Sequence, residues 1–216
     1  MNFLIKTNLY FKKPRVIIVT GNNNVLAAEA IYQVLSKKLK IRKTSIQNIP
    51  FVDKDEILIV ESKTGDLNSL NFLAKNSNSP VLLVTNLGEI SPDNIFFTGN
   101  KKNAEEIKKF IDILPKNTQL ILNFDDETLR VFKSLNNLNI VTFGFGEGSD
   151  FLASDIKLNH ITNFKLNYQG NTVPIWLDFP AEKTHIYDAL AAISVGAIFN
   201  LNLVEVSQIL KNMKSS

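Results

Sequence analysis

The turn at residues 20–24, directly after an apolar run, is the part of this sequence best placed for phosphate chemistry. Backbone N–H groups at the start of a helix point at a bound anion, and the helix dipole favours negative charge there. Phosphoryl transfer also needs a lysine on the phosphate oxygens and a Ser or Thr hydroxyl on Mg²⁺. Residues 22–32 contain no Lys, Arg, Ser or Thr, and the next lysine is Lys37, about three helical turns further along. The candidate nucleotide contacts are Gly21, Asn22, Asn23 and Asn24, and an ordinary strand-to-helix connection is the alternative.

Sulfur and histidine chemistry find no support in the sequence. It contains no cysteine, which excludes thiolate nucleophiles, disulfides and Cys-type zinc sites. The two histidines, His160 and His185, have no Ser, Cys or second His at a spacing typical of a catalytic triad or a zinc pair. We expect surface or capping roles for both.

A buried strand and a helix must position the turn. Residues 16–19 are four consecutive β-branched residues, a pattern typical of a parallel strand buried on both faces, and from Val25 the apolar spacing becomes helical. Further apolar runs at 57–60, 81–84, 120–122 and 140–143 alternate with helical spacing at 67–76, 102–113 and 126–135. The alternation predicts an α/β fold, with a P-loop-NTPase-like, mostly parallel sheet flanked by helices.

The C-terminal part has a different pattern. Short strand candidates at 155–158, 164–168 and 173–177 leave no room for helices between them, so we expect a small antiparallel hairpin element. An Ala-rich apolar helix is predicted over 184–199, and another over 202–213, where Asn202 and Glu205 match an N-cap followed by Glu.

Composition is that of a globular protein. The chain has 216 residues, 44% of them hydrophobic and 21% charged, which excludes a disordered chain, a fibrous repeat or a disulfide mini-scaffold. No linker divides it. We expect residues 1–14 to form a basic lead-in segment and residues 15–216 to form a single domain.

Charge and hydropathy restrict the partners and the location. The 24 basic and 21 acidic residues nearly balance, and only three of the basic residues are arginines, which argues against nucleic-acid binding. Charge interrupts the N-terminus before a signal sequence can form, and the longest uncharged stretch, residues 189–204, is shorter than a membrane span. The absence of cysteine suits a reducing compartment. We therefore expect a cytoplasmic protein without a membrane span.

Five stretches, taken in order, resemble the central ATP-binding domain of the Mur ligases, the cytoplasmic enzymes that add amino acids to the UDP-linked peptidoglycan precursor. The resemblance is greatest to the type that adds D-alanyl-D-alanine. No single stretch is specific, but the ordered set covers nearly the whole chain. The stretches are residues 13–21 with 29–32, 58–61 with 65–66, 84–89, 114–126 and 187–192.

The resemblance also implies site residues. Glu61 matches the carboxylate that binds Mg²⁺ in the family, and Asn123 and Asp126 lie in the stretch near the nucleotide. Helix capping is the alternative for Glu61 and for Asp126, because carboxylates at strand ends commonly cap the next helix. ATP and Mg²⁺ are the cofactors that these residues would hold, although the departures from the family pattern make the absence of a cofactor our expectation.

Four functional positions of the family have changed. Residues 22–28 replace the Gly-Lys-Ser/Thr turn and contain no lysine, and Ile107 stands where the family has a carbamoylated lysine. Ser91 falls at or near a metal-binding histidine, and residues 184–185 read Thr-His instead of His-Asn. We expect Val25, Leu26 and Ile107 to be buried where charged or polar side chains once served catalysis.

These losses predict a domain that has lost ATP-dependent ligase activity; in that hypothesis it is a non-catalytic binding or regulatory module linked to peptidoglycan precursor synthesis. Its partner would be a second copy or a cell-wall ligase, since the chain has no room for the family's UDP-binding and C-terminal domains. One alternative is an ATP-binding peptide ligase component that works with a partner chain. Another is nucleotide binding without hydrolysis through the backbone of residues 21–24.

Overall fold

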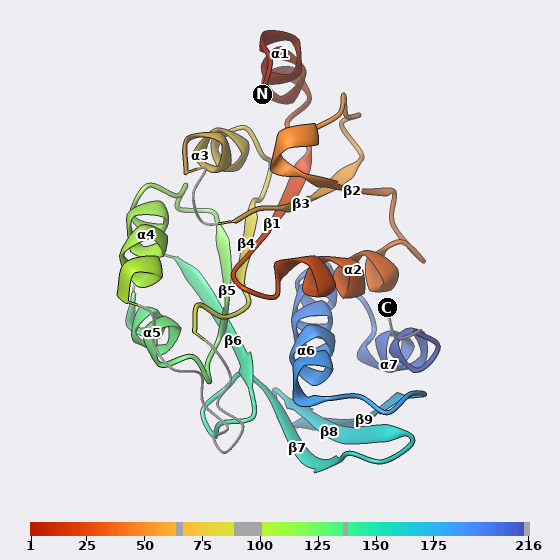
Figure 1. Ribbon diagram of the computed structural model, residues 1–216. Coiled ribbons are helices and arrows are strands. Elements are labelled where there is room, and N and C mark those ends of the chain that lie inside the picture. Colours follow the sequence, from red (N-terminus) through yellow and green to blue (C-terminus); the bar gives the residue numbers. More distant parts are fainter. Residues whose placement is uncertain (64–66, 89–100, 136–137, 214–216) are drawn as a thin grey trace.

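A computed structural model describes residues 1–63, 67–88, 101–135 and 138–213, and shows one nine-stranded sheet in the order β2-β3-β1-β4-β5-β6-β7-β8-β9 (Figure 1). Strands β1 to β7 pair in parallel, whereas β7, β8 and β9 pair antiparallel. The predicted fold class is therefore confirmed. The strands are β1 (Arg15–Thr20), β2 (Ile41–Ser45), β3 (Ile57–Glu61), β4 (Val81–Val84), β5 (Gln119–Asn123), β6 (Asn139–Gly144), β7 (Phe151–Lys157), β8 (Thr162–Tyr168) and β9 (Asn171–Leu177).

Helices follow the strands as the periodicity predicts, with two differences. The lead-in segment is itself a helix, α1, and the helix predicted over 126–135 is a short α5 followed by the 3₁₀ turn η2. Asn202 caps α7 by accepting hydrogen bonds from the backbone of Val204 and Glu205, as its sequence pattern predicts. The helices are α1 (Phe3–Lys12), α2 (Asn24–Leu35), α3 (Leu67–Lys75), α4 (Lys101–Asp112), α5 (Glu127–Arg130), α6 (Lys183–Ile198) and α7 (Leu203–Lys211), with 3₁₀ turns η1 (Ile46–Asn48) and η2 (Val131–Ser134).

Two apolar clusters cover the two faces of the sheet. Ile17 and Val19 of β1 pack with α2, α6 and α7, whereas Val16 and Ile18 pack with α1, α3, α4 and α5 (Figure 1). Alternate side chains of a strand point to opposite faces, so both sets of β1 residues are buried only if both faces are covered. This is the physical reason for the unbroken β-branched run. No helix among the described residues is long and apolar enough to span a membrane.

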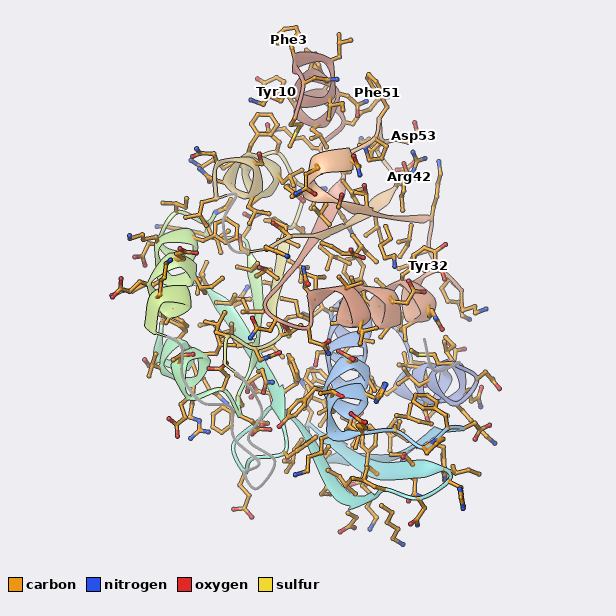
Figure 2. The ribbon with its side chains drawn as sticks, viewed as in Figure 1. Phe3, Tyr10, Tyr32, Arg42, Phe51 and Asp53 are labelled. Carbon is orange, nitrogen blue, oxygen red and sulfur yellow. The ribbon has the colours of Figure 1, made fainter. Side chains whose placement is uncertain are left out.

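Helix α1 leaves a second apolar side in solvent. Leu9 is fully buried against the domain, but the side chains of Phe3 and Phe11 are 79% and 75% exposed. Figure 2 shows Phe3 and Tyr10 of α1 at one end of the molecule, where Phe51 also lies. The helix therefore contributes one buried anchor to the fold and an exposed aromatic surface.

Helix α6 carries a buried carboxyl group into its contact with α2. Asp188 is 7% exposed, and its Oδ1 accepts a hydrogen bond of 2.7 Å from the Asn23 side-chain amide at the start of α2. Burial raises the pKa of Asp188 to about 7, and the hydrogen bond from Asn23 opposes the rise. The α2–α6 contact therefore favours the protonated carboxyl group.

Substitution of the fully buried Phe110 of α4 tests the packing of the core. Phe110→Ala should lower the free energy of unfolding by about 3–5 kcal/mol, because it removes a buried ring and leaves a cavity. Phe11→Ala makes the same chemical change at an exposed site and should stay within about 0.5 kcal/mol of the parent. Urea unfolding measures both, and equal losses would contradict the packing described.

The Asp188 carboxyl group predicts a pH dependence. Its pKa is higher in the folded chain than in the unfolded chain, so its stabilising contribution is complete below about pH 4 and is lost as the pH rises through about 7. Asp188→Asn, which cannot titrate, should gain stability relative to the parent between pH 5 and pH 8, by an amount on the order of 1–3 kcal/mol. Urea unfolding at several pH values gives the free energy of unfolding of the parent and of Asp188→Asn as a function of pH. Equal pH dependence in the two proteins would show that the pKa of Asp188 is not raised by folding.

Candidate functional site

The carboxyl ends of β1, β3, β4 and β5 bring the predicted site residues to one edge of the sheet. In open α/β sheets, this edge is where ligands bind. The residues that meet here are the 21–24 turn after β1, Glu61 at the end of β3, the segment 85–88 after β4, and residues 123–126 at the end of β5. The site is thus built from loops that the parallel strands place side by side.

Gly21 lets the turn lie directly against the 85–86 backbone. Its φ is +112°, and a Cβ atom there would lie 2.3 Å from Thr85 Oγ1 and 2.8 Å from the Asn86 carbonyl oxygen. The Asn22 N–H donates to that same carbonyl at 2.9 Å. Only glycine fits both the conformation and the close contact.

The side-chain amides of the three asparagines are all used inside the protein. Asn22 Nδ2 donates to the carbonyl oxygens of Leu87 and Gly88 at 3.2 and 3.1 Å. Asn23 Nδ2 donates to Asp188, and Asn24 Nδ2 donates to the Ser62 carbonyl oxygen at 3.0 Å. The turn is therefore joined by its own side chains to the loops after β3 and β4 and to α6.

Asp126 acts within the fold in the same way. It is fully buried and caps α5, where its Oδ1 accepts from the backbone of Thr128 and Leu129. Its Oδ2 accepts from the backbone N–H groups of Leu87 and Gly88, at 2.7 and 3.2 Å. Both carboxylate oxygens thus join α5 to the segment after β4.

Asn123 is a buried residue of the candidate site whose side-chain amide group is not fully hydrogen-bonded. Its Oδ1 accepts from the Asp125 N–H at 3.0 Å, while its Nδ2 has no hydrogen-bond partner in the described structure. The side chain is 1% exposed. A ligand could reach it only after the surrounding loops had moved.

Asp125 is a central residue that was not among the predicted site residues. It is fully buried, and it accepts hydrogen bonds from the backbone of Phe145 and Gly146 at 2.6 and 2.9 Å and from the Tyr187 hydroxyl at 2.8 Å. A Cβ on Gly144 would lie 2.7 Å from this carboxylate. The glycine-rich stretch after β6 was the available signal, since its small residues leave room for Asp125. Burial, together with the Asp125 charge, raises the pKa of Tyr187.

Glu61 pairs with a lysine instead of standing free for a metal ion. Its Oε1 lies 3.6 Å from Lys43 Nζ, and the same ammonium group binds the Glu29 carboxylate. The hydrogen bond from Lys43 lowers the pKa of Glu29 against the effect of burial. Lys43 was not among the predicted site residues, because nothing in the stretch 41–45 indicated a strand beside β3.

A cavity of about 350 Å³ opens next to Glu61. It lies at the ends of β2 and β3 and the start of α2. Its lining is mixed: Asn24, Val25, Ser45, Ile46, Gln47, Glu61, Ser62 and Lys63. The cavity therefore has both polar and apolar walls and lies beside the 21–24 turn.

Some of the remaining predictions are confirmed and others are wrong. Ile107 is buried in α4 as expected, but Val25 and Leu26 are 55% and 38% exposed, so their predicted burial is wrong. They lie in the first turn of α2, which faces solvent at this end. His185 accepts from the Glu182 N–H in a capping box, in line with the capping role expected for it. Ser91 lies outside the described residues, within which no group of three or more acidic or histidine side chains could hold a metal ion.

Comparison with known proteins identifies the family. A model of the Mur ligase middle domain matches residues 50–196. The chain is 32% identical over 171 residues to a UDP-N-acetylmuramate--L-alanine ligase of Hydrogenobaculum sp., covering 76% of this chain and 35% of that protein. It is 24% identical over 225 residues to the UDP-N-acetylmuramoyl-tripeptide--D-alanyl-D-alanine ligase of Bacillus subtilis, covering 98% of this chain and 47% of the relative.

Solved structures agree in fold. The MurF ligase of Thermotoga maritima, solved in complex with ADP, superposes with a TM-score of 0.76 at 21% identity, covering 99% of this chain and 51% of that one. A D-alanyl-D-alanyl ligase of Acinetobacter baumannii gives 0.77 at 16% identity, covering 99% and 49%. The chain spans about half the length of these relatives or less. The match to the family model, which extends over more than half of the residues, shows that this chain belongs to the Mur ligases and contains their middle domain.

Proposed function

We propose that this Mur ligase middle domain has lost ATP-dependent ligation and acts as a non-catalytic binding or regulatory module in cytoplasmic peptidoglycan precursor synthesis. The observation that carries the proposal is the state of the 22–24 turn. Its three side-chain amides are bonded to neighbouring loops and to α6, and residues 22–24 themselves include no lysine, serine or threonine.

The residues present do not fit ATP with Mg²⁺. A phosphate at the turn needs a cation, and the family's metal needs a free carboxylate. Asp126 uses both oxygens inside the fold, and Glu61 is paired with Lys43. These two carboxylates, which the resemblance assigns to the nucleotide and the metal, are therefore bonded to other groups of the protein.

The size of the expected loss supports a non-catalytic role. Phosphoryl transfer depends on positioning and on charge stabilisation by lysine and Mg²⁺. Removing one group of this kind lowers the rate by a factor on the order of 10²–10³. The effects of removing groups that act as a unit are not additive. Turnover that depends on several such groups is not expected from this chain.

The proposed partners are a second copy of the chain or a cell-wall ligase. The relatives that it matches are about twice as long, so a middle domain normally acts beside other parts of a ligase. Binding to such a protein would let the domain regulate ligation without carrying out chemistry.

A second candidate is an ATP-binding ligase component that uses a partner chain. The unpartnered Asn123 amide favours it, as does Lys63, which lines the cavity beside the turn together with Glu61. In this alternative Lys63 would supply the cation missing from the turn.

Thermal unfolding with Mg-ATP separates the two candidates. A ligand at a hundred times its Kd stabilises the folded state by about 2.7 kcal/mol. We expect no rise in the unfolding midpoint at millimolar Mg-ATP, with MgCl₂ and sulfate as controls for general ion effects. A rise specific to ATP that Lys63→Ala abolishes, or phosphate release by the purified chain, would contradict the proposal and favour the second candidate.

The variant N24G/V25K/L26T restores the family's turn chemistry and provides a positive control. Val25 and Leu26 are exposed, so polar replacements there should be tolerated. If the turn is the right place for phosphate, this variant should respond to Mg-ATP more strongly than the parent in the same thermal assay. Equal responses would mean that any nucleotide binds elsewhere.

A further inference from the structure

Two carboxylates from different elements converge on one ammonium group. Glu29 lies on α2 and Glu61 at the end of β3, and both pair with Lys43 of β2. The three side chains are 30%, 18% and 27% exposed, so the cluster is partly shielded from water. An arrangement of this kind would repel itself if the ammonium group were absent.

The sheet register explains why Lys43 reaches this point. Strand β2 runs parallel to β3 with Lys43 beside Ile59 and Ser45 beside Glu61, so Lys43 and Glu61 lie on the same face. Ile59 packs in the cluster that includes α2, which brings Glu29 over that face. The adjacent residue Arg42 points the other way, where it pairs with Glu56 at 3.0 Å near Asp53 (Figure 2).

Both oxygens of Glu29 already have a partner. Its Oε2 pairs with Lys43, and its Oε1 accepts from Gln33 Nε2 at 3.2 Å. A divalent ion held between Glu29 and Glu61 would have to displace the Lys43 ammonium group, which is covalently attached to the sheet. Displacement would also leave Lys43 near a divalent charge in a partly shielded site, which is unfavourable.

We propose that Lys43 is the resident cation of this site and excludes a divalent metal ion from Glu61. Its ammonium group takes the position between Glu29 and Glu61 that would otherwise suit Mg²⁺ or Mn²⁺, ions that prefer carboxylate oxygen. The inference deepens the proposed non-catalytic function and rests on it. It also assigns Lys43 a specific role: it neutralises a carboxylate pair without metal.

Manganese titration without nucleotide tests this role. We expect no saturable Mn²⁺ binding by the parent chain or by Lys43→Arg, which keeps the charge, when binding is measured by calorimetry and by the Mn²⁺ electron paramagnetic resonance signal. Lys43→Gln should bind Mn²⁺ saturably, with an apparent Kd at least about tenfold below the highest Mn²⁺ concentration at which the parent shows no binding, equivalent to about 1.4 kcal/mol. The double variant K43Q/E61Q should lose that binding. Mn²⁺ binding by the parent that Glu61→Gln abolishes, or no gain in folded K43Q, would overturn the proposal.

A second measurement uses the parent chain alone, so the test does not depend on the folding of the variants. The Lys43 ammonium group should give a slowly exchanging ¹⁵N NMR signal, because two carboxylates hold it. Stoichiometric Mn²⁺ should leave the width of this signal unchanged, whereas selective broadening would place the metal at Glu61. The titration contains no ATP, so ATP binding at the turn would refute the proposed function while leaving the role of Lys43 to be decided by manganese alone.

Discussion

Most hydrogen-bonding groups at the carboxyl edge of the sheet have partners within the protein, and many of these partners are its own side chains. A buried polar group without a partner costs about 1–3 kcal/mol, so an edge built from four strand ends and their loops requires such internal bonds. Thr20 Oγ1 and Asn123 Nδ2 are exceptions in the described structure. Asn22 and Asp126 both bond to the segment after β4, and Asp125 holds the loop after β6 and Tyr187. The architecture at this edge depends on that network.

The network includes two places that the resemblance associates with ligands. At the turn, neutral amides stand in the stretch where the resemblance expects lysine and a hydroxyl group, and they bind carbonyl oxygens and Asp188. At Glu61, the Lys43 ammonium group supplies the positive charge. In both places the fold keeps the geometry of a nucleotide-handling scaffold while its polar groups are satisfied internally.

The fold was largely predictable because its signals are local. The β-branched run of β1 and the alternation of strands with helices each follow from residues close in sequence, and the N-cap of α7 is a short motif. Strand β2 escaped prediction because it is an edge strand with polar residues, Arg42 to Ser45, and only Ile41 is apolar. Strand β7 begins four residues before the predicted one, since a register shift near Asp155, at φ +51°, disturbs its alternation.

The chemistry of the site was less predictable because it depends on contacts between distant residues. The sequence indicated Glu61, but its pairing with Lys43 follows from the register of an unrecognised strand. Asp125 gained its role from glycines about twenty residues later. The exposure of Val25 and Leu26 likewise depends on which end of α2 faces solvent.

The side-chain amides of the 22–24 turn give the most direct test of whether the polar groups of the site are hydrogen-bonded within the protein. Assigned ¹⁵N NMR signals of Asn22, Asn23 and Asn24 report whether each amide group is bonded within the protein. We expect slow hydrogen exchange for these amides and no change in their chemical shifts when Mg-ATP is added to millimolar concentration. Rapid exchange in the free chain, or a saturable shift of the three amides with nucleotide, would contradict this expectation.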